Sequence, residues 1–261
     1  MLTGTVVDVS TPTPLLRRLV VRVPGLGTPA APAPGQWVRL YVPEPQGTAG
    51  RLAVGAREMA GHTPRSYTVQ AWDPAQETCV LDFVLHQPAG PASTWAAAAR
   101  TGDELPLAGP IGRPGLPLDA GPLRVLFLAD TTALPAVREL VGALPRGSAA
   151  RAVIAAAASE RVPLAAPDGV ALTLDWTDPG GDALTKAATV IGGGPTVPSV
   201  QGEVPVDLGS AIGGAAERSE THVWVGAEAG AVSEIRRLAT TAGVPRPLLH
   251  ATAYWRRAVS A

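Results

Sequence analysis

The pattern of apolar residues changes near residue 120, and this change restricts the chain to a small set of folds. Before it, short apolar runs are separated by turns rich in Gly and Pro, which is typical of consecutive β-strands. After it, buried-type strands alternate with helical patterns, which indicates a parallel sheet covered by helices. We therefore predict an antiparallel β-barrel domain over residues 1–120 and an α/β domain over residues 121–261.

The first domain is expected to consist of strands and a single helix. The helix is predicted at Pro91–Ala99, because proline suits a first helical turn and Gly102 follows the run. Residues 43–64 carry Gly, Pro and charge without periodicity, so we predict a long loop there. The predicted strands are Thr5–Val9, Leu15–Val23, Trp37–Val42, Ser66–Trp72 and Thr78–His86.

The second domain is expected to alternate strands with helices. Apolar side chains recur on one helical face in Ala133–Leu144 and in Glu228–Ala242, and in the latter Arg236 and Arg237 point toward solvent. Residues 192–219 show no period, and we predict no element there. The predicted strands are Leu123–Ala129, Ala149–Ala155, Val170–Trp176, His222–Val225 and Leu248–Ala253.

The charges and cysteines exclude several classes of function. The 21 basic and 22 acidic residues are scattered, so the sequence indicates no nucleic-acid partner and no anionic membrane surface. The single Cys79 forms no internal disulfide, and no apolar run reaches the roughly 20 residues of a membrane span. Four scattered His and one Cys offer no metal site. We expect a cytoplasmic protein that acts on small molecules.

The segment Arg65-Ser66-Tyr67-Thr68 combines a cation with an aromatic ring at the start of a strand. Because side chains alternate along a strand, Arg65 and Tyr67 point to one side and the other two residues to the opposite side. A guanidinium binds a phosphate in a fork geometry, and a tyrosine ring can lie against an isoalloxazine. The segment is therefore a candidate flavin site, although alone it is also compatible with an ordinary edge strand.

Residues 86–95 have the pattern of a strand end that is followed by small residues and then by the start of a helix. The free amides of such a start can bind a pyrophosphate. Ser93 and His86 would add side-chain donors, while Gly90 and Ala92 would let the backbone approach the ligand. The structural alternatives are a surface histidine at position 86 and a core side chain for Trp95.

Seven blocks in a fixed order carry a resemblance: RSYT, DFVLHQPAGPASTWA, Gly102-Asp103, LAGPIG, ADTTALPA, VWVGAEAGAV and AYWRR. Together they resemble the siderophore-interacting protein family of FAD-dependent ferric-siderophore reductases, except over residues 43–64 and about 177–220. The resemblance implies a ferredoxin-reductase-like fold, in which an FAD-binding barrel precedes a nicotinamide-type α/β domain. The residues that it implies for FAD binding are Arg65, Ser66, Tyr67, Thr68, His86, Gly90, Ala92, Ser93, Trp95, Thr132, Tyr254 and Trp255.

The resemblance also implies a few basic groups that attract an anionic ferric chelate by charge. The positions that match are Arg39, Arg113, His250 and Arg256. The sequence departs from the family at Ile111, where a basic residue can follow Gly-Pro, and at His250, where an Arg is expected. A histidine carries its charge only partly near neutral pH, so the identity of the substrate is left open.

The activity that the resemblance implies is the reduction of ferric siderophores, which releases ferrous iron, with NAD(P)H or a ferredoxin as the electron donor. The redox chemistry belongs to the FAD cofactor, so no residue is predicted to be a general acid or base. An NAD(P)H site rests on the fold alone, because Gly25–Ala30 and Gly192–Gly194 lead into prolines instead of a helix. Two alternatives are a flavin reductase with another acceptor and a degenerate flavin-binding module.

Overall fold

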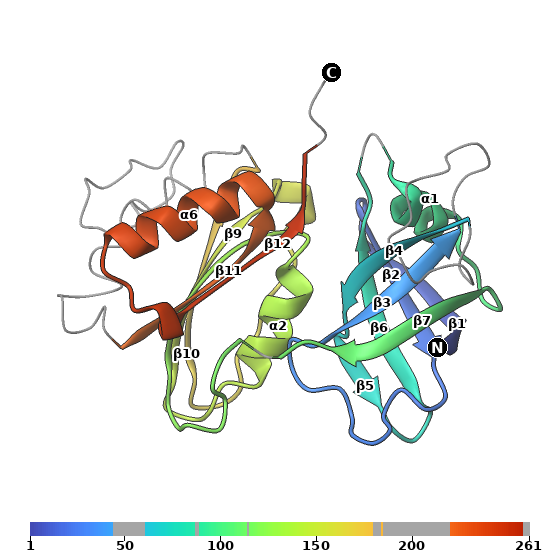
Figure 1. Ribbon diagram of the computed structural model, residues 1–261, viewed down its shortest axis with the longest axis horizontal. Helices are drawn as coiled ribbons and strands as arrows, with labels where there is room; N and C mark the ends of the chain where they lie inside the picture. Colours follow the sequence, from blue (N-terminus) through green and yellow to red (C-terminus); the bar gives the residue numbers. More distant parts are fainter. Residues whose placement is uncertain (44–60, 87–88, 114, 180–183, 185–219, 258–261) are drawn as a thin grey trace. The chain divides into compact units, whose positions relative to one another are not determined.

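Figure 1 shows the computed structural model, which describes the chain except for residues 44–60, 87–88, 114, 180–183, 185–219 and 258–261. The chain divides into two compact units, Met1–Pro114 and Gly115–Ala261. Strands of the first unit pair antiparallel, and strands of the second pair parallel. The predicted fold class, a β-barrel followed by an α/β unit, is confirmed.

The described residues of the first unit form a seven-stranded sheet in the order β4-β3-β7-β1-β2-β6-β5. Strand β4, at one edge, also contacts β6, so the sheet curls toward closure as a barrel does. One helix, α1 (Pro91–Ala98), packs Ala92 and Ala96 against the barrel core. The strands are β1 (Leu2–Thr13), β2 (Leu16–Arg22), β3 (Trp37–Pro43), β4 (His62–Thr68), β5 (Ala71–Asp73), β6 (Thr78–Val84) and β7 (Glu104–Ile111).

The structure corrects the predicted strand Ser66–Trp72, which is in fact split between β4 and β5. Strand β4 begins at His62, inside the predicted loop, and the remainder of that loop, residues 44–60, lies outside the described residues. Pro64 is compatible with a strand here because β4 is at the edge of the sheet, where a missing N–H breaks no ladder. Proline therefore misled the prediction of where the loop ends.

Strand β7 was not predicted at all. Pro106, Gly109 and Pro110 interrupt its apolar pattern, and each of these residue types normally weakens a strand. The strand nevertheless pairs with β1 through Leu105 and Leu107, whose side chains are buried in the barrel core. Burial of these side chains, supplied by the rest of the barrel, thus outweighs the poor local propensity of the segment.

The second unit contains a parallel sheet in the order β10-β9-β8-β11-β12. The chain moves outward from β8 through β9 to β10 and then returns to the other side of β8 with β11. Between β8 and β11 the direction of winding reverses, which makes this the topological switch point of the sheet. The strands are β8 (Arg124–Asp130), β9 (Ala149–Ala155), β10 (Ala171–Thr177), β11 (Thr221–Glu228) and β12 (Leu249–Trp255).

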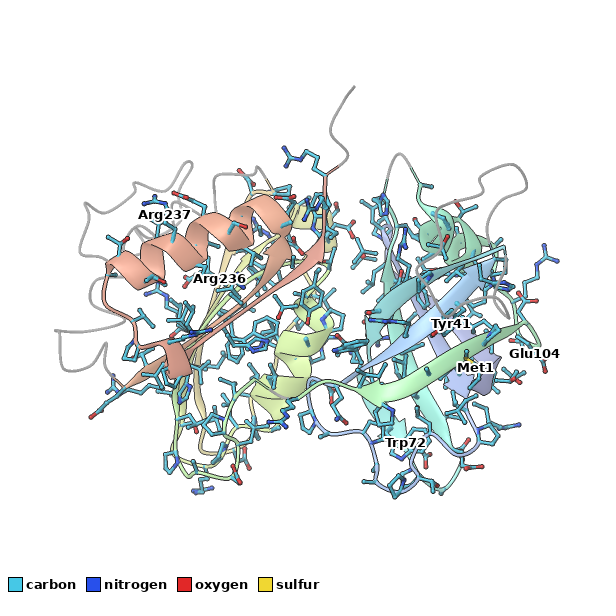
Figure 2. The ribbon with its side chains drawn as sticks, in the orientation of Figure 1. Met1, Tyr41, Trp72, Glu104, Arg236 and Arg237 are labelled. Atoms are coloured by element: carbon cyan, nitrogen blue, oxygen red, sulfur yellow. The ribbon has the colours of Figure 1, made fainter. Side chains whose placement is uncertain are left out.

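Helices cover both faces of this sheet (Figure 1). Helix α2 (Leu134–Gly142) packs on the face that carries Phe127, and α6 (Ala229–Thr241) packs on the face that carries Leu128. Both helices were predicted, and so was the exposure of Arg236 and Arg237, which Figure 2 labels on α6. The described residues also form two short 3-10 helices, η2 (Ala158–Glu160) and η4 (Arg246–Leu248).

Two further observations concern only the part of the chain that the structure describes. None of its helices is both long and apolar enough to cross a membrane. None of its groups of His, Cys, Asp and Glu is arranged to hold a metal ion. Residues 192–219, for which the sequence predicted no element, lie outside the described residues.

Candidate functional site

The strand register places Arg65 and Tyr67 on one side of β4. Tyr67 lies opposite Val38 and Arg65 lies opposite Leu40 on β3, and both partners are fully buried. The next residue, Ser66, lies opposite the exposed Arg39 on the other face. The register therefore confirms the predicted alternation and places the cation and the ring on the same side of β4, where Tyr67 is half-buried and Arg65 is exposed.

A row of aromatic rings links β4 to helix α1. Phe83 on β6 is completely buried, and its ring centroid lies 4.1 Å from that of Tyr67 and 6.0 Å from that of Trp95 on α1. Strand β4 also contacts α1 directly. The Arg65–Tyr67 strand and the small-residue helix start, which were predicted to share one ligand, therefore lie together. Burial raises the pKa of Tyr67, so its phenol remains neutral.

The start of α1 has free backbone donors. Its N-cap residue, Gly90, is extended with φ −82 and ψ 171 and makes no side-chain capping bond. Pro91 occupies the first turn and contributes no N–H, and the first turn contains no acidic residue. The amides of Ala92 and Ser93 thus meet no capping carboxylate among the described residues, as a phosphate-binding helix start requires.

Two side chains predicted for the same helix end also gather there. The His86 backbone N–H donates to Ser93 Oγ at 3.3 Å, which ties the strand end to the helix. A hydroxyl that accepts one hydrogen bond still has its own proton to donate. The His86 imidazole lies against Gly90, since a Cβ built on that glycine would be 3.8 Å from the ring. His86, Gly90 and Ser93 therefore lie together at this helix start.

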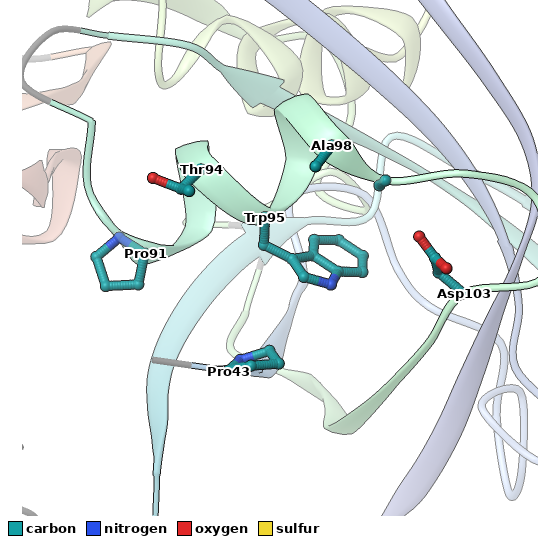
Figure 3. Close-up of a pocket in the computed structure, with 7 residues that line it drawn as sticks. Pro43, Pro91, Thr94, Trp95, Ala98 and Asp103 are labelled. Atoms are coloured by element: carbon teal, nitrogen blue, oxygen red, sulfur yellow. The ribbon is translucent and has the colours of Figure 1, made fainter. Parts of the chain in front are cut away.

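A depression of about 280 Å³ runs along α1 (Figure 3). Pro91, Thr94, Trp95 and Ala98 line it from the helix, and Pro43 and Asp103 line it from the barrel. Figure 3 shows the indole of Trp95 in the space between Pro43 and Asp103. Trp95 thus has two environments, because it contacts Phe83 on the core side and this depression on the other.

The residues predicted to bind the chelate in the first unit are Arg39 and Arg113, and both are exposed. Arg39 holds its guanidinium 5.2 Å from the ring centroid of Trp37, a cation–π geometry. Because Arg39 shares its face with Ser66, it lies on the opposite side of the β3–β4 pair from Tyr67. The structure therefore does not place Arg39 on the same side as Arg65 and Tyr67, the residues predicted to hold the flavin.

His250, the third predicted substrate residue, is packed against aromatic neighbours within the second unit. Its ring stacks on that of Trp224 with centroids 5.8 Å apart and planes inclined by 15°. On Gly115 an added Cβ would lie 2.6 Å from His250 Nδ1, so that backbone closes over the imidazole. Burial lowers the pKa of His250, and the nearby Arg236 lowers it further. A neutral, packed imidazole is poorly suited to electrostatic capture, and its substrate-binding role stays a prediction.

The carboxyl end of β8 carries Asp130, whose side chain accepts hydrogen bonds from three segments. Its Oδ1 accepts from the Thr132 N–H at 2.9 Å and from the Thr132 hydroxyl. Its Oδ2 accepts from the Glu228 N–H at 3.1 Å and from Trp255 Nε1 at 2.8 Å. Burial raises the pKa of Asp130, while these hydrogen bonds oppose the rise. One carboxylate thereby connects the carboxyl ends of β8, β11 and β12.

Glu228, at the end of β11, has a comparable role. Its Oε2 accepts from the N–H groups of Gly230 and Ala231 at 2.6 and 3.2 Å, which caps the start of α6. Its Oε1 accepts from the Arg257 N–H at 3.2 Å. Burial alone would raise the pKa of Glu228, but the three backbone donors outweigh that effect and lower it.

Sequence reasoning missed Phe83, Asp130 and Glu228 as site residues. The available signal was an acidic residue directly after an apolar strand and before a helix, a position where a carboxylate can cap backbone donors. At the same edge, the structure places four residues predicted to bind FAD or the chelate: Thr132, Tyr254, Trp255 and Arg256. They belong to the second unit, and their contacts with a flavin stay a prediction.

An antiparallel barrel followed by a doubly wound parallel sheet defines the ferredoxin-reductase-like class of flavoproteins. Residues 5–114 match the model of the siderophore-interacting FAD-binding domain, and residues 123–258 match that of the siderophore-interacting protein. The chain belongs to the siderophore-interacting protein family. Its first unit matches the FAD-binding domain of this family, and two relatives are named ferric acinetobactin reductase and ferric vibriobactin reductase ViuB.

Several proteins show this relationship. The mycobactin import ATP-binding/permease protein IrtA of Mycolicibacterium smegmatis is 27% identical over 97% of this chain, which spans only 25% of that protein. The ferric acinetobactin reductase of Acinetobacter baumannii is 29% identical over 52% of this chain and 43% of its own length. A siderophore utilization protein from T. fusca superposes with a TM-score of 0.72 at 28% identity, covering 99% of this chain and 93% of that one.

Proposed function

We propose that this protein is an FAD-dependent reductase that reduces ferric siderophores and so releases ferrous iron. One observation carries the proposal most directly. In a domain that matches an FAD-binding family, the Arg65–Tyr67 strand and an uncapped helix start lie together through the ring of Phe83. A guanidinium, an aromatic ring and free amides are the groups that hold the phosphates and the ring system of a flavin.

The residues of the first unit fit FAD in distinct ways. Arg65 is exposed and supplies a cation for a phosphate. The amides of Ala92 and Ser93 supply donors for the pyrophosphate, and Gly90 offers no capping side chain that would compete for them. Phe83 covers one face of the Tyr67 ring, which leaves the opposite face for the isoalloxazine. Bound FAD would supply the electron transfer, while the protein binds and orients it.

The substrate and the electron donor are parts of the same proposal. The ferric acinetobactin reductase and the ferric vibriobactin reductase ViuB are relatives by sequence, which supports a ferric siderophore or another ferric chelate as substrate. Exposed Arg39, Arg113 and Arg256 would attract an anionic chelate by charge. NAD(P)H or a ferredoxin would supply the electrons, and the reaction would take place in the cytoplasm.

One observation favours a second candidate, a flavin reductase of the same fold with a different acceptor. His250 is stacked on Trp224 with a lowered pKa, so the second unit offers one cation fewer than the family pattern implies. A weaker cationic surface would favour acceptors that carry less negative charge, such as quinones.

The proposal is tested on the purified full chain. We expect a yellow protein with a flavin absorption spectrum that bleaches when NADH, NADPH or reduced ferredoxin is added without oxygen. Adding ferric siderophores to the bleached protein should restore the yellow colour and release ferrous iron, detected with a ferrous-specific dye. Quinones are tested in parallel.

The outcomes separate the candidates. Reoxidation by quinones alone would favour the second candidate. A colourless protein that takes up no FAD, or a flavin that no donor bleaches, would contradict both and would favour a binding module without reductase activity.

A further inference from the structure

The carboxyl edge of the parallel sheet holds the chain's own C-terminal segment at the switch point. Asp130 ends β8 and Glu228 ends β11, the two strands between which the winding reverses. In doubly wound sheets this crevice is the usual place for a ligand. Here Asp130 accepts the indole N–H of Trp255, and Glu228 accepts the backbone N–H of Arg257. Two carboxylates on neighbouring strands thus anchor two points of one short segment.

The same carboxylates occupy donors that could otherwise bind an anion. Glu228 accepts from Gly230 and Ala231 at the start of α6, and Asp130 accepts from the Thr132 N–H in the turn before α2. Helix starts of this kind often hold phosphates. Because these amides already bind carboxylates of the chain, they are not available to the phosphate of a ligand.

The anchored residue, Trp255, is unusual in its exposure. The residue is 41% exposed, whereas Trp224 on the neighbouring strand is 2% exposed. The indole N–H donates at 2.8 Å to Asp130, a carboxylate that three other hydrogen bonds hold in place. An aromatic ring with a fixed polar end and an open face is typical of binding surfaces. The hydrogen bond therefore determines the direction in which this open ring faces.

We propose that Asp130 is a positioning residue that docks the segment 255–257 at the switch point, with Glu228 as a second anchor, and holds the ring of Trp255 in one orientation. The role of that ring toward a flavin rests on the proposed function. The docking itself does not depend on the proposed function, and it can be measured without any redox assay.

The first measurement is a double-mutant cycle on unfolding by denaturant. Asp130→Asn keeps the shape of the side chain but replaces one oxygen by a donor, and Trp255→Phe keeps a ring but removes the indole N–H. If the two groups are bonded, the combined variant should unfold less readily than the sum of the single effects predicts. We expect a coupling of about tenfold in the unfolding equilibrium constant, as for a hydrogen bond to a charged group.

The second measurement follows the exposure of Trp255 by acrylamide quenching of tryptophan fluorescence. The contribution of Trp255 is obtained by subtracting the signal of the matching Trp255→Phe protein. Its quenching constant should rise about twofold in Asp130→Asn, because the ring loses its anchor. Glu228→Gln keeps an acceptor oxygen and should have a smaller effect. Glu234→Gln, which removes an exposed ion pair with Arg237 on α6, is the matched control and should have none.

The outcomes separate the docking from the proposed function. A coupling near zero together with unchanged quenching of Trp255 would overturn the proposal, whatever the flavin does. If Asp130→Asn folds poorly, the quenching of Trp255 in Glu228→Gln tests the second anchor, which binds the Arg257 backbone N–H, and unchanged quenching there would overturn that anchor. Where docking is confirmed, Asp130→Asn and Trp255→Phe should shift the flavin absorption spectrum alike. Unchanged spectra would contradict only the part that rests on the proposed function.

Discussion

Two helix starts in this chain differ in whether a side chain of the chain caps their backbone amides. At α1 the N-cap is Gly90, no side chain caps the helix, and the first turn carries no acid. At α6 the N-cap is Glu228, whose carboxylate binds the amides of Gly230 and Ala231. The backbone geometry that favours an anion is common to both. The residue at the N-cap therefore decides whether a helix start remains available for a cofactor phosphate or is satisfied by the chain itself.

The largest expected effect comes from giving α1 the kind of cap that α6 has. Gly90→Asp is compatible with the local backbone, since φ is −82 and a Cβ would meet His86 only at ordinary contact distance. The new carboxylate would occupy the free amides and repel a pyrophosphate, so the Kd for FAD should rise about a hundredfold. Titration of the FAD-free protein with FAD, followed by flavin fluorescence, measures it.

The matched control is Gly90→Ala, which adds the Cβ without the charge. It should change the Kd for FAD by less than about threefold, because a methyl group neither fills the amide donors nor repels a phosphate. The stability of Gly90→Asp should differ from that of the wild type by only a few tenths of a kcal/mol, since aspartate and glycine are both accepted at an N-cap. Unchanged FAD affinity in Gly90→Asp would place the pyrophosphate elsewhere.

A second, somewhat smaller effect is expected at Arg65. Arg65→Ala removes the proposed cation for the FAD phosphate and should raise the Kd for FAD about thirtyfold, as expected for the loss of a hydrogen bond between charged groups. Flavin occupancy of the purified protein, read from its absorption spectrum, should fall accordingly. Arg22→Ala removes another exposed arginine of the barrel, on β2, and should leave occupancy unchanged. Equal flavin occupancy in Arg65→Ala and Arg22→Ala would contradict the proposed role of Arg65 in FAD binding.

The placement of Arg65, Tyr67 and the start of α1 was predictable because these segments carry local signals. The Arg65–Tyr67 alternation follows from the geometry of a strand, and the open start of α1 follows from a glycine and a proline in the right order. Phe83 could not be assigned in this way, because a buried phenylalanine on a strand looks the same in every core. Its position between two rings depends on the curvature of the whole sheet.

The second unit shows where sequence reasoning is weaker. The helices and the parallel strands follow from periodicity, whereas the contact of Asp130 with Trp255 joins residues that are far apart in the sequence. His250 was judged by its residue type, but its charge depends on the stacking with Trp224, which only the packed sheet shows. Strand β7 was missed because tertiary burial outweighs its prolines. In each case a long-range contact determines the property.

The smallest effect tests whether the stability of the second unit can be changed without affecting FAD binding. Burial raises the pKa of Glu139 on α2 to about 7, although Arg138 opposes the rise. A raised carboxyl pKa means that ionisation destabilises the folded state, so the cost is absent below the unfolded pKa and complete above the folded one.

Glu139→Gln removes that cost. After allowance for solvent screening, the variant should be more stable than the wild type by about 1 kcal/mol near pH 8 and equally stable near pH 4. Thermal unfolding at the two pH values measures the difference, expected as about 2–4 °C in Tm near pH 8. The Kd for FAD should not change, because Glu139 lies on α2 and is none of the residues proposed to bind FAD. A gain in stability that is equal at both pH values would mean that Glu139 does not titrate in this range. A change in FAD affinity would show that Glu139 and the FAD site are energetically coupled.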